Sequence, residues 1–321
     1  MLPNSFGDPK LTSAPCDVFN SWIYLPIGTG QEAIHLDNVI TTEGLTKRFG
    51  DKTAVDGLDL RVKKGEIFGF LGPNGAGKTT TIRLITTLEN KDSGTVRLNG
   101  YDIEKDKIKA KTSIGVIQQH ISLDNDLTVM ENLVCHAMFH KLPKDVRKER
   151  VEQLIEYLEI GEYRDYKVTS LSGGWKKRVS IACALIHEPT ILFLDEPTVG
   201  LDIQARRLIW DIVRKLNSDE KTVFLTTHYI EEAEALCDRV AFINQGRIIA
   251  LGTPEELCRK VGSTAVEYFD GTRKTNYMYF EDRERANEFV NTLDTKDTVI
   301  IRNTNLEDCF VELTGKKVVA E

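Results

Sequence analysis

Short apolar runs alternate with stretches of helical periodicity from Asn38 onward, and this alternation is typical of an α/β protein with a mostly parallel sheet. Five runs are predicted to be strands: Glu66 to Leu71, Ser113 to Ile117, Thr190 to Leu194, Thr222 to Thr226 and Arg239 to Ile243. Within three of them, Ile67 to Leu71, Ile191 to Leu194 and Val223 to Leu225 are apolar without alternation. Strands covered on both faces show this pattern, so these three are predicted to be central.

Two further regions predict different layers. The segments Asp51 to Gly65 and Gly94 to Gly100 alternate apolar with polar residues and contain turn residues, so they predict an antiparallel β layer at the edge of the core. Between Thr128 and Gly174 no convincing strand pattern appears, and two helical patterns lie on either side of Pro143. These patterns run from Val129 to His140 and from Lys144 to Glu159. A helical insertion in the α/β core is therefore predicted, and it spans about residues 120–174.

The two ends of the chain are predicted to be appendages. Residues 1–37 contain several Pro, Gly, Ser and Asn residues and one apolar cluster, Trp22 to Ile27, so they predict a mobile N-terminal extension. The main domain is expected to span residues 38–262. Residues 263–321 alternate Tyr, Phe and Val with charged residues, and a helical pattern covers Glu281 to Leu293. They predict a small α+β accessory domain.

Composition excludes several classes of protein. The chain has 321 residues, 41% hydrophobic content and a net charge of −7, as expected for a folded, soluble chain. The richest apolar run, Ile181 to Leu194, is interrupted by His187, Glu188 and Pro189, so no membrane-spanning helix is expected. The first 22 residues do not resemble a secretory signal. The six cysteines form no C-x-x-C pair, and the acidic balance argues against nucleic acid as the main partner.

A phosphate-binding loop is predicted between an apolar strand and a helical stretch. The segment that fits G-x-x-x-x-G-K-[ST] is Gly72, Pro73, Asn74, Gly75, Ala76, Gly77, Lys78, Thr79 and Thr80. In such a loop the glycines let backbone N–H groups face the β-phosphate, and the helix N-terminus adds a positive dipole end. Lys78 is expected to reach the β- and γ-phosphates, and Thr79 to offer its hydroxyl to Mg²⁺. ATP and Mg²⁺ are therefore the expected ligands.

Two adjacent carboxylates end the apolar run Ile191 to Leu194. Asp195 is expected to help hold Mg²⁺, as the corresponding aspartate does in P-loop enzymes. Glu196 is then free to polarise a water for in-line attack on the γ-phosphate. A strand simply ended by acidic residues is the alternative, and the phosphate-loop motif makes that alternative weaker.

The order of further motifs resembles the ATP-binding-cassette ATPases. Leu171-Ser172-Gly173-Gly174 opens a predicted helix, and Val199-Gly200-Leu201-Asp202 follows the carboxylate pair. The resemblance implies a head-to-tail homodimer in the ATP-bound state, with each ATP between the phosphate loop of one subunit and Ser172, Gly173 and Gly174 of the other. A hydroxyl and N–H groups at a helix N-terminus suit a γ-phosphate. Ser172 can also cap that helix, and both roles are compatible.

Four other residues match family positions one by one. The resemblance implies that Phe49 stacks on adenine, although an ordinary core or edge aromatic is the alternative. Gln119 matches the glutamine that contacts Mg²⁺ and links the site to the helical insertion, and Gln118 is the alternative register. His228 matches the switch histidine that binds the γ-phosphate and helps to position Glu196. Asp202 matches the loop aspartate that couples the two sites.

One residue departs from the family pattern. Trp175 occupies the position after Ser-Gly-Gly where the family usually has glutamine. The phosphate contacts of Ser172 and the two glycines are retained, but the hydrogen bonds of the amide are lost. Packing of Trp175 at the dimer or transporter interface and reduced hydrolysis are both expected consequences.

The resemblance covers about residues 38–260, and the tail Asn305 to Gly315 resembles the drug-export (daunorubicin-resistance type) ATPase subunits. It implies an ATP-hydrolysing subunit that powers a separate membrane permease, with export of a drug-like or lipid-like substrate. The subunit is expected at the cytoplasmic face of the membrane as a peripheral protein, soluble when isolated. Coupling to the permease is expected on the Gln119 to Met138 face. A soluble regulatory module with little ATP turnover is the alternative.

Overall fold

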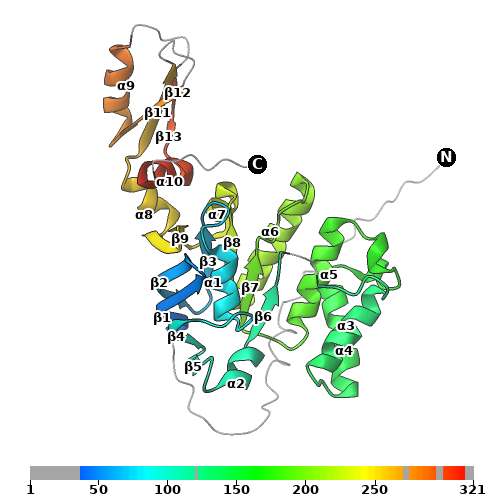
Figure 1. Cartoon of the computed structure of the whole chain (residues 1–321). Helices are drawn as coiled ribbons and strands as arrows, with labels where there is room; N and C mark the ends of the chain where they lie inside the picture. Colours follow the sequence, from blue (N-terminus) through cyan, green and yellow to red (C-terminus); the bar gives the residue numbers. More distant parts are fainter. Residues whose placement is uncertain (1–36, 120–121, 270–274, 294–298, 315–321) are drawn as a thin grey trace, which may run out of the picture. The chain divides into compact units, whose positions relative to one another are not determined.

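A computed structural model describes residues 37–119, 122–269, 275–293 and 299–314 (Figure 1). The described residues belong to one compact unit, Leu36–Glu321. The predicted N-terminal extension falls outside the described residues except for Asp37.

A six-stranded sheet forms the centre of this unit and has the order β10-β9-β3-β8-β7-β6. Its parallel strands are β3 (Ile67–Leu71), β6 (Ile114–Ile117), β7 (Ile191–Asp195), β8 (Thr222–Thr227) and β9 (Arg239–Asn244), and β10 (Arg247–Gly252) runs antiparallel to β9. All five predicted strands are confirmed. Every residue of β3, β7 and β8 is buried and each has neighbours on both sides, so the central position of the three apolar runs is also confirmed.

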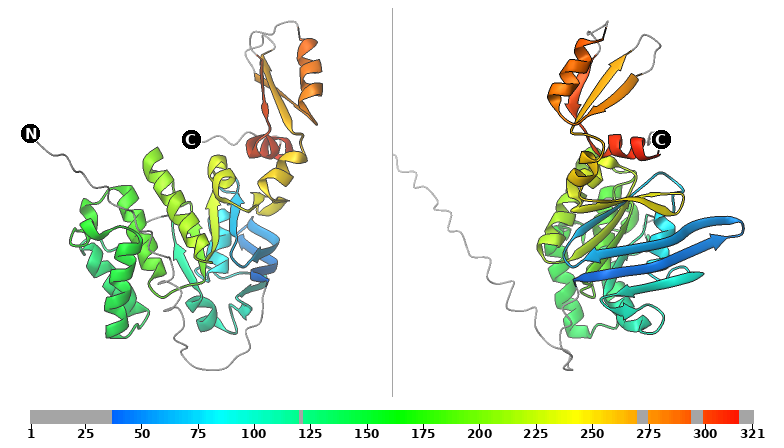
Figure 2. Two further views of the ribbon diagram at one scale, coloured as in Figure 1. Left: turned by 180° about the vertical axis from the view of Figure 1, so that it is seen from behind. Right: turned by 90° about the vertical axis from the view of Figure 1, so that its left-hand side faces the viewer.

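A second, antiparallel sheet has the order β2-β1-β4-β5 and confirms the predicted edge layer. It contains β1 (Asn38–Phe49), β2 (Lys52–Lys63), β4 (Ser93–Leu98) and β5 (Tyr101–Asp102). Figure 2 shows β1 and β2 as a long blue pair. Phe68, Phe70 and Phe193 surround Phe224 with ring centres 5.4 to 5.6 Å away, and these rings share one core cluster with residues of β1 and β2. Helix α1 (Lys78–Ile85) packs its buried side chains into the same cluster.

The helical insertion is confirmed as well, and its helices form the green group in Figure 1. It contains α3 (Val129–Phe139), α4 (Lys144–Tyr157), the 3-10 turns Gly161–Tyr163 and Val168–Ser170, and α5 (Gly173–Leu185). Pro143 is the residue that precedes α4, and a capping box formed by Thr128 and Glu131 begins α3. These local signals explain why the chain is helical here.

Three more helices complete the α/β core. Helix α2 (Lys107–Thr112) precedes β6, α6 (Ile203–Ser218) follows the carboxylate strand β7, and α7 (Ile230–Leu236) follows β8. Asp202 caps α6, because its side chain accepts a hydrogen bond from the N–H of Ala205 at 2.8 Å. In the described ranges 37–119, 122–269, 275–293 and 299–314, no helix has both the length and the apolar character to cross a membrane.

The C-terminal region has the predicted α+β composition. It begins with α8 (Pro254–Arg259) and contains β11 (Thr264–Phe269), β12 (Thr275–Phe280), α9 (Arg283–Asn291), β13 (Ile300–Asn303) and α10 (Leu306–Thr314). The three strands form an antiparallel sheet of order β12-β11-β13. Phe310 of α10 contacts Phe242 of β9 with ring centres 5.5 Å apart, and the N–H of Leu306 donates to Glu234 of α7. The domain boundary at residue 263 stays a prediction.

Candidate functional site

The predicted phosphate loop lies between β3 and α1, where the sequence pattern places it. Gly77 precedes α1 with φ of 111°, a conformation that strongly favours glycine. A Cβ atom at Gly72 would lie 2.3 Å from the carbonyl oxygen of Ile243 in β9. The loop therefore requires glycine at these two positions for different reasons, one conformational and one steric.

Lys78 is buried at the start of α1, with 5% of its side chain exposed. Its Nζ donates to the carbonyl oxygens of Gly72 at 2.8 Å and Pro73 at 3.2 Å. The same ammonium forms an ion pair with Glu196 Oε1 at 3.1 Å, and the Glu196 side chain is 8% exposed. The lysine of the phosphate loop and the predicted general base are thus in direct contact.

Asp195 ends β7 beside the phosphate loop. Its Oδ1 accepts a hydrogen bond from Thr79 Oγ1 at 3.2 Å and another from Thr226 Oγ1 at 2.6 Å. Thr226 lies opposite Asp195 in the parallel pairing of β7 with β8. Thr226 belongs to no local sequence motif, and only the order of the strands reveals its place in the site.

Glu196 is held by neighbours on several elements. Its backbone has φ of 46°, and its N–H donates to Thr226 Oγ1 at 3.0 Å. Gln119 Nε2 donates to Glu196 Oε2 at 3.3 Å, and His228 Nδ1 lies 3.3 Å from Oε1 without the angle of a hydrogen bond. Burial acts to raise the pKa of Glu196, but His228 and the Lys78 ammonium outweigh it, and the pKa lies below its usual value. Glu196 is therefore held as a carboxylate.

The structure separates the two neighbouring glutamines. Gln119 directs its amide to Glu196, whereas the carbonyl oxygen of Gln118 accepts a hydrogen bond from Lys177 Nζ of α5 at 3.2 Å. Lys177 is 3% exposed, and burial lowers its pKa to about 8, although Asp195 and Glu232 attract the charged form. This geometry favours Gln119 as the residue of the site. The buried Lys177 was not singled out from the sequence.

Ser172, Gly173 and Gly174 lie at the start of α5 and have neighbours outside the phosphate loop. Ser172 occupies the N-cap position, but its side chain makes no capping hydrogen bond. A Cβ atom at Gly174 would lie 3.0 Å from Ala205 Cβ, and one at Gly173 would lie 3.3 Å from Leu201. The N-terminus of α5 thus packs beside the start of α6, within a small pocket that also includes Trp175 and Asp202.

Trp175 packs within the chain. Its ring centre lies 4.3 Å from that of Tyr163, and the guanidinium of Arg178 lies 4.6 Å from the Trp175 ring. Arg178 in turn donates to the carbonyl oxygen of Leu158, which follows α4. Trp175 therefore connects the start of α5 to the rest of the helical insertion, and its half-buried ring remains the predicted interface residue.

Phe49 lies at the end of β1 with 49% of its surface exposed. Lys47 Nζ lies 5.1 Å from the ring centre, a cation–π contact on one face of the ring. This exposure excludes a core aromatic, whereas an edge aromatic, the other form of the alternative, is equally compatible with it. The proposed stacking on adenine is compatible with this position.

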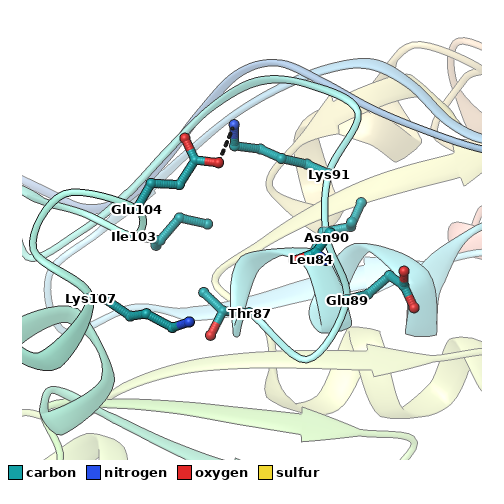
Figure 3. A pocket seen from close by; sticks show the side chains of 8 residues that line it. All are labelled: Leu84, Thr87, Glu89, Asn90, Lys91, Ile103, Glu104 and Lys107. Atoms are coloured by element: carbon teal, nitrogen blue, oxygen red, sulfur yellow. Dashed lines mark ion pairs between the residues drawn. The ribbon is translucent and has the colours of Figure 1, made fainter.

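A separate polar pocket lies beyond the end of α1, and Figure 3 shows its side chains. Its residues come from the end of α1, the segment after it, the segment before α2 and the first residue of α2. They are Leu84, Thr87, Glu89, Asn90, Lys91, Ile103, Glu104 and Lys107. Lys91 and Glu104 form an ion pair at 3.0 Å. None of these eight residues belongs to the predicted ATP site.

The residues around Asp195 fit Mg²⁺ and a nucleotide triphosphate chemically. Thr79 and Asp195 offer a hydroxyl and a carboxylate that already approach each other, and Gln119 adds an amide oxygen near Glu196. Oxygen ligands of this kind are those that Mg²⁺ prefers. Lys78, whose ammonium is satisfied here by a carboxylate and two carbonyl oxygens, has the charge that phosphate groups require.

Comparison with known proteins identifies the family. The sequence pattern described as ABC transporter matches residues 55–199. The Nod factor export ATP-binding protein I of Ralstonia nicotianae is 38% identical over 307 residues, covering 87% of this chain and 95% of that protein. The chain belongs to the ATP-binding subunits of ABC transporters. The predicted family resemblance is thereby confirmed.

Further relatives of the ABC subunit agree with this assignment. The daunorubicin resistance ATP-binding protein DrrA3 of Streptomyces coeruleorubidus is 42% identical, covering 72% of this chain and 73% of that protein. Among solved structures, the dimeric post-hydrolysis state of the ATP-binding cassette MJ0796 bound to ADP and Pi superimposes with a TM-score of 0.60 at 28% identity, covering 67% of this chain and 98% of that one. Drug-export relatives are thus among the matches, and the fold is that of an ATP-binding cassette.

Proposed function

We propose that this ABC subunit hydrolyses ATP in a Mg²⁺-dependent reaction and powers a separate membrane permease. The observation that carries the proposal is the position of Glu196, which contacts Lys78, His228 and Gln119 and lies one residue after Asp195. Three groups meet at one edge of the parallel sheet. They are Lys78 for phosphate, Asp195 for the metal ion and Glu196 as the charged base. This edge is the usual ligand side of an open α/β sheet.

The proposed mechanism assigns one task to each of these residues. Backbone N–H groups of residues 72–80 and the Lys78 ammonium bind the β- and γ-phosphates. Thr79, Asp195 and Gln119 would hold Mg²⁺, and the bound ion would supply positive charge beside the phosphate oxygens. Glu196 accepts a proton from the attacking water, and His228 contacts the γ-phosphate and orients Glu196.

Binding and catalysis are linked in this mechanism through Lys78. Its ammonium pairs with Glu196 at 3.1 Å in this structure. A phosphate that draws Lys78 toward itself leaves Glu196 free to act as a base. Because His228 remains beside Glu196, the carboxylate keeps a partner that favours its charged form.

The proposed active form is a head-to-tail homodimer. Ser172 and Gly173 are exposed, and the near neighbours of Gly173 and Gly174 are Leu201 and Ala205 rather than phosphate-loop residues. This supports a contact between the start of α5 and the γ-phosphate bound by a second subunit. The dimeric cassette structure of a relative supports this arrangement. In the proposed homodimer of this chain, Phe49 stacks on adenine, and Asp202 couples the two ATP sites.

Export of a drug-like or lipid-like substrate is the proposed transport reaction. Relatives named for daunorubicin resistance and Nod factor export support it. The permease is proposed to hold the subunit at the cytoplasmic face of the membrane and to contact the Gln119 to Met138 face. Co-purification with a membrane permease tests this part separately from ATP hydrolysis.

Phosphate release from ATP tests the enzymatic part of the proposal. The purified chain is expected to release phosphate with Mg²⁺ and to stop when EDTA removes the metal. Lys78→Ala is expected to lower turnover by about 100-fold or more, because it removes the positive charge that stabilises the transferred phosphate group. Lys105→Ala, at an exposed position, is the matched control and is expected to retain activity. Absence of turnover in the wild type would favour the regulatory module with little ATP turnover. Metal-independent turnover, or full activity of Lys78→Ala, would contradict the proposed mechanism.

A further inference from the structure

Glu232 is a carboxylate with no exposed surface in the first turn of α7. Its Oε1 accepts hydrogen bonds from Thr198 Oγ1 at 2.9 Å and from Trp210 Nε1 at 3.1 Å. Its Oε2 has no hydrogen-bond partner within the described parts of the chain. Burying a carboxylate costs free energy unless hydrogen bonds compensate for the lost water. The two hydrogen bonds of Glu232 Oε1 do not reach the residues predicted to bind phosphate or metal.

The partners of Glu232 connect it to both residues proposed to act on water. Thr198 is fully buried and lies two residues after Glu196. Helix α7 begins at Ile230, two residues after His228. The hydrogen bond between Thr198 and Glu232 therefore joins the segment that carries Glu196 to the helix that follows His228. Trp210 of α6 donates its hydrogen bond to the same carboxylate, so α6 is also connected to Glu232.

A second set of bonds holds the other side of Glu196. Strands β7 and β8 pair in parallel with Asp195 opposite Thr226, and the N–H of Glu196 donates to Thr226 Oγ1. These bonds end at Thr226, one residue before the end of β8. Beyond the strands, Thr198 and Glu232 provide a side-chain bond that keeps the two diverging segments together. The contact between His228 Nδ1 and Glu196 Oε1, at 3.3 Å, lies between the bonds to Thr226 on one side and the bond from Thr198 to Glu232 on the other.

We infer that Glu232 is a positioning residue for ATP hydrolysis and that its Oε1 fixes the separation between Glu196 and His228. The inference rests on the proposed function, because it assigns Glu196 and His228 the roles given there. Glu232 itself touches neither nucleotide nor metal. It acts through Thr198 on one side and through the start of α7 on the other.

Steady-state ATP hydrolysis by four variants tests the inference. Glu232→Leu and Thr198→Val each remove one side of the hydrogen bond, and each is expected to lower kcat by at least about tenfold, because small misplacements of catalytic groups reduce rates strongly. The KM for ATP is expected to stay within about twofold, because the phosphate loop is unchanged. Glu232→Gln keeps an oxygen that accepts both bonds, so it is expected to restore most of the activity. Glu231→Gln is the matched control on the same helix, with 82% of its side chain exposed.

A purely structural role for Glu232 predicts different results. It would lower activity in proportion to the fraction of folded protein, which thermal unfolding followed by circular dichroism measures. If Glu232 instead positions Glu196 and His228 through its hydrogen bond with Thr198, both single changes remove the same interaction. The double variant Thr198→Val/Glu232→Leu is then expected to have about the same kcat as the slower single variant. Thr198→Val preserves the shape of the side chain and supplies this test even where Glu232→Leu fails to fold.

Two results overturn the inference. One is a Thr198→Val or Glu232→Leu protein that folds normally and retains the wild-type kcat. The other is a loss of activity that the loss of folded protein fully explains. Glu196→Gln provides the reference for the proposed function: if it is inactive while Glu232→Leu is active, only this inference fails. If Glu196→Gln turns over ATP like the wild type, the proposed function fails and this inference falls with it.

Discussion

At the scale of single residues, the ion pair between Lys78 and Glu196 is the proposed link between nucleotide binding and catalysis. Both side chains are buried, and removing one partner of such a pair typically costs about 3 to 5 kcal/mol. Because that cost comes from the charge left without a partner, we expect the pair to open when another anion takes the place of Glu196 beside Lys78. A γ-phosphate is an anion of this kind, so we expect the base to become free only when ATP is bound.

The steric requirement at Gly72 gives a prediction about stability. In Gly72→Ala the new Cβ would lie 2.3 Å from the Ile243 carbonyl oxygen, and we expect the free energy of unfolding to fall by about 3 kcal/mol. Gly75→Ala is the matched control in the same loop. It meets nothing within 4 Å and adds only the cost of its positive φ of 77°, about 1 kcal/mol. Urea unfolding measures both, and equal losses would contradict the close approach of the loop to β9.

The sequence predicted most of the residues that meet at this site because they belong to contiguous motifs. Residues 72–80 and the pair Asp195 and Glu196 each carry a local pattern with a chemical reason. Thr226 and Glu232 could not be found in this way, because their roles depend on the pairing of β7 with β8 and on the packing of α7 against α6. Such contacts are tertiary and leave no local pattern.

At the scale of elements, α5 is joined to the segment that precedes Gln119 by the bond from Lys177 to the Gln118 carbonyl oxygen. Helix α5 begins with the residues expected to contact the ATP of the partner subunit, and Gln119 contacts Glu196. One buried lysine thus connects two segments of the site. This connection has a measurable electrostatic consequence.

The lowered pKa of Lys177 predicts how stability depends on pH. The pKa is about 8 in the folded chain against 10.5 for an ordinary lysine, so the unfolded chain binds the proton more tightly between these values. Stability from this group therefore rises as pH increases through that range. We expect the difference in unfolding free energy between wild type and Lys177→Met to shift in favour of the wild type by about 2 kcal/mol from pH ~8 to ~9.5.

Urea unfolding at the two pH values measures this difference. Lys176→Met is the matched control, because Lys176 is the preceding residue on α5 and is only half-buried. It is expected to show no comparable shift. A pH-independent difference for Lys177→Met would show that Lys177 does not experience the burial seen in the structure.

The elements that the sequence predicted share a strong local signal. The apolar runs of β3, β7 and β8 and the Pro143 break between α3 and α4 are examples. Strand β1 was not predicted as a strand, and its pairing with β2 has several register shifts, including one between Thr42 and Leu45. Helix α10 was also missed, and its contacts to α7 and β9 are tertiary, so they leave no local pattern.

At the scale of the whole molecule, the separation of Ser172 from the phosphate loop matters most. Its neighbourhood consists of α5 and α6, so a single chain does not bring Ser172 to its own nucleotide through these contacts. The proposed head-to-tail dimer supplies the missing contact. The relative solved as a dimer with ADP and Pi supports this assembly.

ATP-dependent dimerisation of the ABC subunit follows from this assembly. With hydrolysis blocked by Glu196→Gln, Mg²⁺ and ATP are expected to convert monomer to dimer in size-exclusion chromatography with light scattering. Adding Ser172→Arg to this background is expected to abolish the dimer and leave binding of a fluorescent ATP analogue within about threefold, because the change places a bulky side chain where the γ-phosphate of the partner is expected. A dimer that forms equally with Ser172→Arg would contradict the head-to-tail arrangement.

The most direct test of the central claim is the rate of phosphate release at saturating ATP and Mg²⁺ for wild type and Glu196→Gln. Glu188→Gln, at an exposed position after α5, is the control for loss of a carboxylate elsewhere. If Glu196 is the general base, turnover of Glu196→Gln falls by about 100-fold or more while ATP remains bound, and Glu188→Gln behaves like the wild type. Turnover by Glu196→Gln at the wild-type rate would contradict the account.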